Sequence, residues 1–125
     1  MSKVAYSLTL TLAAAGVCGL IAYAQTAKAD PVKVDPKHYK VELENDNVRV
    51  LRVHYEPSEK SVMHFHPRSV AVFLTDGKTR MTLPDGKSMD SPGKAGAVSW
   101  ADAGSHLPQN VGSKATDVIV VELKK

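Results

Sequence analysis

Three histidines are the residues of this chain best suited to chemistry. His64 and His66 are separated by one residue in the stretch 61–67, which reads as a strand ending at Pro67. Side chains in a strand alternate with period 2, so both imidazoles are expected to face one side together with Val62. Imidazole nitrogens bind divalent transition metals, so this pair predicts half of a metal site. His106, further along the chain, is the candidate third ligand.

Length and composition predict one globular domain. The chain has 125 residues, of which 43% are hydrophobic, enough for a single core. The net charge is +3. Basic residues are scattered among acidic ones without a basic run or interleaved aromatics, which argues against nucleic-acid binding. The only cysteine is Cys18, so a domain that begins at residue 30 has no disulfide and no thiol chemistry.

Residues 1–29 have the features of a secretory signal peptide. Lys3 precedes an uncharged apolar run, and small residues with cleavage-site spacing end at Ala24 and at Ala29. The second site directly precedes Asp30, so we predict cleavage after Ala29 and export to the periplasm. The apolar run is also long enough to span a bilayer, and an uncleaved membrane anchor is therefore the alternative.

The chain after residue 30 reads as short strands separated by turns that contain Gly, Pro and Asp. No segment shows helical periodicity over three turns, which predicts an all-β sandwich or barrel. Residues 31–36 read as an extended lead-in, and residues 88–96 are weakly patterned. Besides the histidine strand, we expect strands at 39–44, 48–55, 69–74, 78–83, 97–100 and 117–123.

The histidine and glycine spacing resembles that of the cupins, small double-stranded β-helix (jelly-roll) proteins. Their first motif is His-x-His followed by a glutamate and a glycine. Here His64 and His66 are followed by Val70 at the glutamate position and Gly77 at the glycine position. Ala71 stands at the alternative glutamate spacing.

The second cupin motif joins a glycine to a histidine and an asparagine. Gly104, His106 and Asn110 match it, preceded by Gly96, whereas Asp102 stands where proline is usual. The resemblance covers residues 41–123. It implies an all-β cupin jelly-roll barrel that forms a single domain over residues 30–125.

The resemblance also implies the ligand set. Neither Val70 nor Ala71 can bind a metal, so the expected ligands are His64, His66 and His106 alone, around one divalent transition metal. Three protein ligands leave a coordination position open to water or substrate. Cupins similar to this pattern use iron, others hold zinc, nickel, copper or manganese, and some bind ligands without a metal. Export favours zinc or copper, because both outcompete Fe(II) at imidazole sites outside the cytoplasm.

Two functions follow from the resemblance. The first is a metalloenzyme, an oxygenase or isomerase of a small organic molecule, whose catalytic residues the sequence leaves unassigned. The alternative is a non-catalytic module that binds a small ligand or a metal. A homodimer formed through edge strands is a third reading, with residues 118–123 either in the interface or inside the barrel.

The remaining polar and aromatic residues have plainer interpretations. His38 is expected to be solvated, and His54 to lie on the outer sheet or at the mouth of a pocket. Asp102 either orients a histidine or is a plain turn acid, and Asn110 is expected to stabilise a turn. Aromatic side chains usually pack in the core, and we expect the same of Phe65, Phe73 and Trp100.

Overall fold

The structure is a computed structural model that describes residues 29–125. The predicted signal peptide, apart from Ala29, lies outside the described residues, as does Cys18. Within the described range, no helix has the length and apolar character that a membrane span requires.

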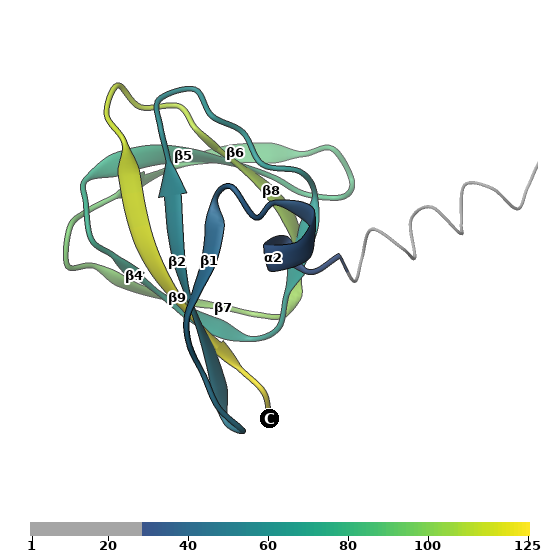
Figure 1. Cartoon of the computed structure of the whole chain (residues 1–125). Helices are drawn as coiled ribbons and strands as arrows, with labels where there is room; N and C mark the ends of the chain where they lie inside the picture. Colours follow the sequence, from purple (N-terminus) through teal and green to yellow (C-terminus); the bar gives the residue numbers. More distant parts are fainter. Residues whose placement is uncertain (1–28) are drawn as a thin grey trace, which may run out of the picture.

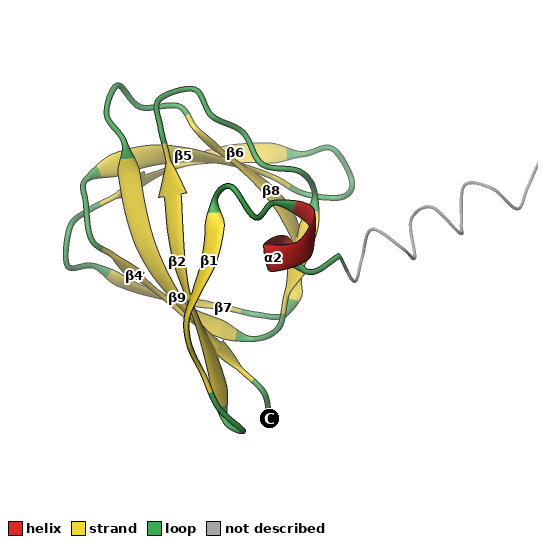
Figure 2. Cartoon of the chain, in the orientation of Figure 1, coloured by secondary structure: helices red, strands yellow, loops and turns green. Residues whose placement is uncertain are grey.

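Two antiparallel sheets face each other and form a barrel (Figure 1, Figure 2). One sheet has the order β1-β2-β9-β4-β7 and the other β3-β8-β5-β6. A short helix, α2, packs against β1 and β3. The elements of the described chain are α2 (Pro31–Val34), β1 (Tyr39–Glu44), β2 (Val48–Tyr55), β3 (His64–His66), β4 (Ser69–Phe73), β5 (Gly77–Thr82), β6 (Ser88–Gly93), β7 (Val98–Ala101), β8 (Gly104–Asn110) and β9 (Thr116–Leu123).

The core lies on the inner face of the five-stranded sheet. Leu51, Val53 and Tyr55 alternate along β2 with residues that face outward, and Tyr39 of β1 joins them. All four are less than 10% exposed. This alternation is the period-2 pattern expected of a strand with one buried face.

The predicted strands 39–44 and 48–55 are confirmed at both ends. The Asn45 side chain accepts hydrogen bonds from the backbone N–H groups of Asn47 and Val48, at 2.8 and 3.0 Å, and so closes the predicted turn between them. The strand predicted at 117–123 is also present and begins one residue earlier. It lies between β2 and β4, which places residues 118–123 inside the sheet rather than at an edge.

The extended lead-in predicted at 31–36 is wrong. Residues 31–34 form α2, whose first turn is capped by the Asp30 carboxylate accepting the Val32 N–H at 3.1 Å. Pro31 at the start of the helix is favourable, because its fixed φ suits a helix and its missing N–H would have no partner there. A helix of four residues is too short for periodicity to reveal it.

Two strands were missed. No residue of β6 is buried, so its exposed edge position leaves no alternating pattern. β8, which carries His106 and Asn110, is not among the strands expected from the sequence, but it is a central strand of the four-stranded sheet. Pro108 within it obscures the strand pattern, because proline is rare inside sheets.

Two side chains lie elsewhere than predicted. Val62 does not share the face of His64 and His66, because β3 begins only at His64 and Val62 is 48% exposed. Trp100 is not a core residue: it is 55% exposed on the edge strand β7. Its indole N–H donates to the Asp102 carboxylate at 3.0 Å.

Gly77, the glycine of the first motif, marks a close approach between two strands. A Cβ at this position would lie 2.3 Å from the Thr116 methyl group, a side chain that is itself buried. We expect Gly77→Ala to lower the free energy of unfolding by about 1–3 kcal/mol, the usual cost of overpacking. Gly104→Ala is the matched control, since nothing lies within 4 Å of its Cβ position. Equal stability of the two variants in urea denaturation would contradict the proposed contact.

Candidate metal centre

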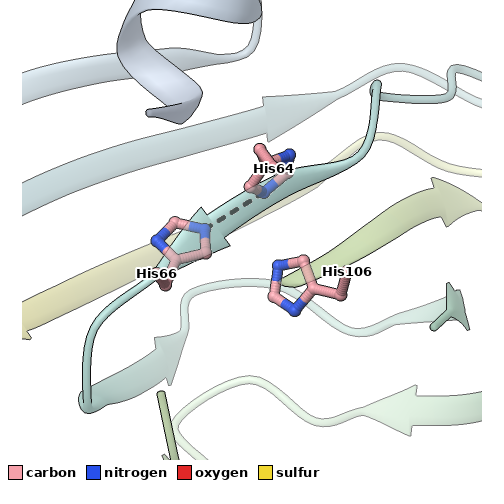
Figure 3. A group of neighbouring side chains, drawn as sticks. All are labelled: His64, His66 and His106. Atoms are coloured by element: carbon pink, nitrogen blue, oxygen red, sulfur yellow. Dashed lines mark hydrogen bonds between the residues drawn. The ribbon is translucent and has the colours of Figure 1, made fainter. Parts of the chain in front are cut away.

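Antiparallel pairing of β3 with β8 brings the three histidines together. The register sets His64 directly opposite His106, with His66 two residues further along β3. The ring centroids are 4.9 to 5.1 Å apart, and the candidate ligand atoms all lie within 4.8 Å of one another (Figure 3). The three residues named from the sequence could therefore hold one metal ion. That they do so stays a prediction.

Hydrogen-bond partners determine which nitrogen of each β3 histidine carries the proton. Nδ1 of His64 lies 2.8 Å from the Val62 carbonyl oxygen, and Nδ1 of His66 lies 2.6 Å from a Glu122 carboxylate oxygen. A carbonyl or an ionised carboxylate can only accept, so both Nδ1 atoms are the donors. In the neutral rings each Nε2 therefore carries a lone pair.

The two Nε2 atoms of His64 and His66 face each other at 3.1 Å (Figure 3). Two lone pairs at this distance repel unless a positive charge lies between them, which is a proton in the metal-free protein or a metal ion. Metal–nitrogen bonds of about 2.0–2.1 Å in a tetrahedral site give a nitrogen–nitrogen separation of about 3.3 Å. This pair therefore fits a metal centre with little movement.

His106 is suited to be the third ligand because its ring stays neutral. Burial lowers its pKa to about 3, with further contributions from His66 and His64. Its ring makes no hydrogen bond to the rest of residues 29–125, so its nitrogens are free to bind a metal. Burial, followed by the neighbouring His66, also lowers the pKa of His64 to about 4.

A chain of charges behind His66 holds its ring. One Glu122 oxygen accepts from His66, and the other accepts from Arg49 Nε at 2.6 Å. Both terminal nitrogens of Arg49 then donate to Asp30 at 3.0 Å. Burial raises the pKa of Glu122, but the hydrogen bonds from His66 and Arg49 outweigh it and leave the pKa below its usual value. Such carboxylate partners orient a metal-binding imidazole and raise its basicity.

Glu122 is not among the residues predicted from the sequence, although the sequence carries a signal. Glu122 shares the parity of Val118 and Val120, which face inward from β9, so an acid stands in the buried row of an apolar strand. It is only 2% exposed. A buried acid needs a partner, and a nearby histidine pair is an obvious one.

A second hydrogen-bonded group supports His64. Nδ1 of His64 also lies 3.2 Å from the Ser61 hydroxyl oxygen. This hydroxyl donates a hydrogen bond to the Asp35 carboxylate at 2.6 Å. Asp35 in turn binds His38 at 2.8 Å, and Glu59 binds the other nitrogen of His38 at 3.0 Å. His38 is 6% exposed, so the prediction that it is solvated is wrong.

The other candidates lie outside the histidine cluster. His54 is on the outer face of the sheet, bound to Asp117 and Glu56 at 2.9 and 3.0 Å. Asp102 accepts from Trp100 and forms no hydrogen bond to a histidine within residues 29–125. Asn110 confirms its predicted turn role, because its buried amide donates to two backbone carbonyls and accepts the Gly112 N–H.

A cavity of about 280 Å³ adjoins the cluster and lies between the two sheets. Two positions, Val70 and Ala71, have the spacing at which cupins carry the glutamate ligand. Ala71 lines the cavity and Val70 does not, so the wall carries a methyl group there. His66 and His106 also line it, together with Tyr39, Val53, Tyr55, Ser69, Phe73, Thr79, Met81, Ser99, Ala101, Pro108, Thr116, Val118 and Val120.

The charge chain behind His66 leads to a prediction about metal affinity. We expect Glu122→Gln to weaken Zn²⁺ binding 10- to 100-fold, because the amide loses the negative charge that holds and polarises the imidazole. A chelator competition titration measures this. Glu44→Gln is the matched control, since Glu44 forms an exposed ion pair with Lys124. Unchanged affinity in Glu122→Gln would show that this carboxylate does not act on the metal.

The lowered histidine pKa values lead to a prediction about the metal-free protein. In the unfolded chain both histidines titrate near 6.5, above their folded values of about 4 for His64 and about 3 for His106. Protonation therefore favours unfolding, and stability falls as the pH drops below about 6.5. The slope is at most about 1.4 kcal/mol per pH unit for each histidine.

Urea denaturation of the metal-free protein at pH 7 and at pH 5 measures this loss. His106→Asn should reduce the slope, whereas His54→Asn should not, because its carboxylate partners raise the pKa of His54 instead. Equal stability at the two pH values would contradict the burial of two neutral imidazoles.

Comparisons with known proteins identify the fold. No family model and no curated protein matches the sequence. Among solved structures, a cupin domain from Bordetella pertussis Tohama I is 24% identical with a TM-score of 0.65, over 70% of this chain and 92% of that one. A double-stranded β-helix protein from Klebsiella pneumoniae is 24% identical with a TM-score of 0.54, over 67% and 74%.

A third similar structure is an RmlC-like cupin from Methanocaldococcus jannaschii. It is 18% identical with a TM-score of 0.54, over 71% of this chain and 83% of that one. Likeness at these identities concerns the fold and not the activity. Together with the two facing sheets, it shows that the chain has the cupin fold, a double-stranded β-helix.

Proposed function

We propose that this protein binds one divalent transition metal through His64, His66 and His106 and acts on a small organic molecule as an oxygenase or isomerase. The observation that carries the proposal is the pair of Nε2 atoms 3.1 Å apart, each in a ring whose Nδ1 is already committed to an acceptor. A cavity wide enough for an organic ligand adjoins two of the three histidines.

The residues of the chain divide the work at this site. The three imidazoles would hold the metal, which supplies Lewis-acid polarisation of a substrate oxygen or activation of dioxygen when bound. Glu122 accepts the proton of His66 Nδ1 in a hydrogen bond, which leaves the Nε2 lone pair available to a metal. Its negative charge offsets positive charge at the site. The mostly apolar cavity walls would limit the contact of the reacting groups with water, which would strengthen electrostatic interactions there.

A non-catalytic module that binds a small ligand or metal is the second candidate. The observation in its favour is the composition of the cavity wall, which contains no Asp, Glu or Lys side chain among the described residues. A reaction that needs a carboxylate or an amine as general base would find neither there. Turnover of a substrate by the metal-loaded protein separates the two candidates.

The choice of metal follows from the ligand set and from the proposed export. Three neutral imidazoles suit zinc and copper, which outcompete Fe(II) at such sites when affinity alone decides, whereas iron, manganese and nickel are the alternatives. We therefore propose zinc or copper as the resident metal of an exported protein.

Export with removal of the leader after Ala29 is part of the proposal, and an uncleaved membrane anchor is its alternative. Asp30 would be the first residue of the processed protein, and its carboxylate caps α2 and binds Arg49. Among the hydrogen bonds of residues 29–125, cleavage would remove the one from the Phe65 N–H to the Ala29 carbonyl oxygen. The charge chain that ends at His66 would therefore survive processing.

A homodimer is also proposed, through the edge of the five-stranded sheet. The edge strand β7 exposes 65% of Val98 and 55% of Trp100. These pair in register with Val72 and Val70 of β4, so apolar residues of two strands adjoin on one face. Exposed apolar patches of this kind mark interaction sites on soluble proteins.

Elemental analysis of the purified protein tests the metal site. We expect close to one transition-metal ion per chain, lost in the His64→Ala/His66→Ala double variant because two of three ligands are gone. His54→Ala is the control, since that histidine lies outside the cluster and should keep full metal content. Absence of metal from the unaltered protein, even after incubation with Zn²⁺ or Cu²⁺, would overturn the proposal.

A further inference from the structure

We propose that the cavity beside the three histidines takes a ligand with one metal-binding oxygen group and an uncharged, apolar body about the size of a substituted benzene ring. The inference rests on the proposed metal-binding function and names the class of molecule that the site accepts. Simple aromatic or cyclic monocarboxylates belong to this class. Sugars, zwitterionic amino acids, dicarboxylates and phosphate esters do not.

The charge of the ligand follows from where the polar groups of the cavity lie. His66 and His106 line the wall next to His64, so a metal held by these histidines would bind a ligand oxygen at one end of the cavity. No Lys, Arg, Asp or Glu side chain of the described chain lines the cavity. A second charge on the ligand would therefore be buried without a partner, which is costly.

The apolar body follows from the rest of the wall. Side chains from both sheets, among them Val53, Phe73, Met81 and Val120, give the cavity a hydrocarbon surface. The hydroxyl groups of Tyr39 and Tyr55 bind each other at 2.9 Å and so have a partner already. A ligand with several hydroxyl groups would lose more hydrogen bonds to water than the serine and threonine side chains of the wall could replace.

The size of the ligand follows from the volume of about 280 Å³. An apolar cavity of about 150 Å³ holds a benzene molecule, so this cavity has space for a ring with a short substituent. Ala71 on β4 and Ala101 on β7 help to keep the space open, because both line it with only a methyl group. We infer that Ala71, which stands at a glutamate position of the motif, determines how large a body can enter.

The test uses the full protein loaded with Co²⁺, whose visible absorption bands change when an oxygen ligand binds. Acetate, succinate and benzoate are titrated separately at one pH and ionic strength. We expect benzoate to bind more than tenfold more tightly than acetate, because only its ring occupies the apolar cavity. Succinate should bind no more tightly than acetate, because its second carboxylate finds no partner.

Two variants locate the effect in the cavity. Ala71→Phe should weaken benzoate binding at least tenfold and leave acetate binding unchanged, because the new ring fills the space and not the metal site. Val41→Phe is the control and should leave both affinities unchanged, since Val41 is 44% exposed on β1 and does not line the cavity. Co²⁺ absorption and thermal unfolding of each variant verify that it is folded.

The outcomes of these titrations distinguish an error in the ligand class from an error in the metal site. If benzoate binds no better than acetate, or succinate binds best, the ligand class is wrong although the metal site stands. Equally tight benzoate binding to the metal-free protein would show that the metal does not hold the polar end. If the unaltered protein binds neither Co²⁺ nor Zn²⁺ nor Cu²⁺, the proposed function itself fails. The titrations of the unaltered protein with acetate, succinate and benzoate test the ligand class even if Ala71→Phe does not fold.

Discussion

The site depends on two imidazole nitrogens held face to face at 3.1 Å. Each ring has its other nitrogen committed to an acceptor, His64 to the Val62 carbonyl and His66 to Glu122. Neither ring can rotate away from the other without breaking such a bond. The protein therefore maintains an arrangement of lone pairs that only a positive charge between them makes favourable.

The two sheets contribute different parts of this arrangement. β3 and β8 of the four-stranded sheet carry the three histidines, whereas Glu122 and Arg49 belong to β9 and β2 of the five-stranded sheet. The 2.6 Å contact between His66 and Glu122 therefore crosses from one sheet to the other. The geometry of the site consequently depends on how the two sheets pack, and a change in the packing should alter the site.

The segment before β1 also helps to hold the histidines in place. Asp30 both caps α2 and binds Arg49, and Asp35 positions the Ser61 hydroxyl beside His64. These two carboxylates reach the two β3 histidines through one or two intermediate side chains each. The acids stand behind the ligands and not in the cavity, which keeps the cavity wall apolar while the imidazoles stay oriented.

The all-β fold and the three candidate metal ligands could be predicted from the sequence, and the resemblance to the cupins added the barrel topology. Alternation in residues 39–44 and 48–55, the turn residues between strands and the His-x-His spacing are all local patterns, so they could be recognised without a structure. The same reasoning failed for α2 and β6, because four residues show no periodicity and an exposed edge strand shows no alternation. It also placed Trp100 in the core, since residue type does not reveal whether an edge strand turns a side chain outward.

The residues that support the histidines, and the cavity beside them, depend on how distant strands come together. Glu122 is separated from His66 by 56 residues in sequence, and only the facing of the two sheets brings them within hydrogen-bond distance. The burial of His38, the choice of Ala71 rather than Val70 as the cavity-lining position and the apolar wall itself depend on how the sheets pack. Local patterns determine strands, whereas contacts between distant strands depend on register and on sheet packing, which no short stretch of sequence encodes.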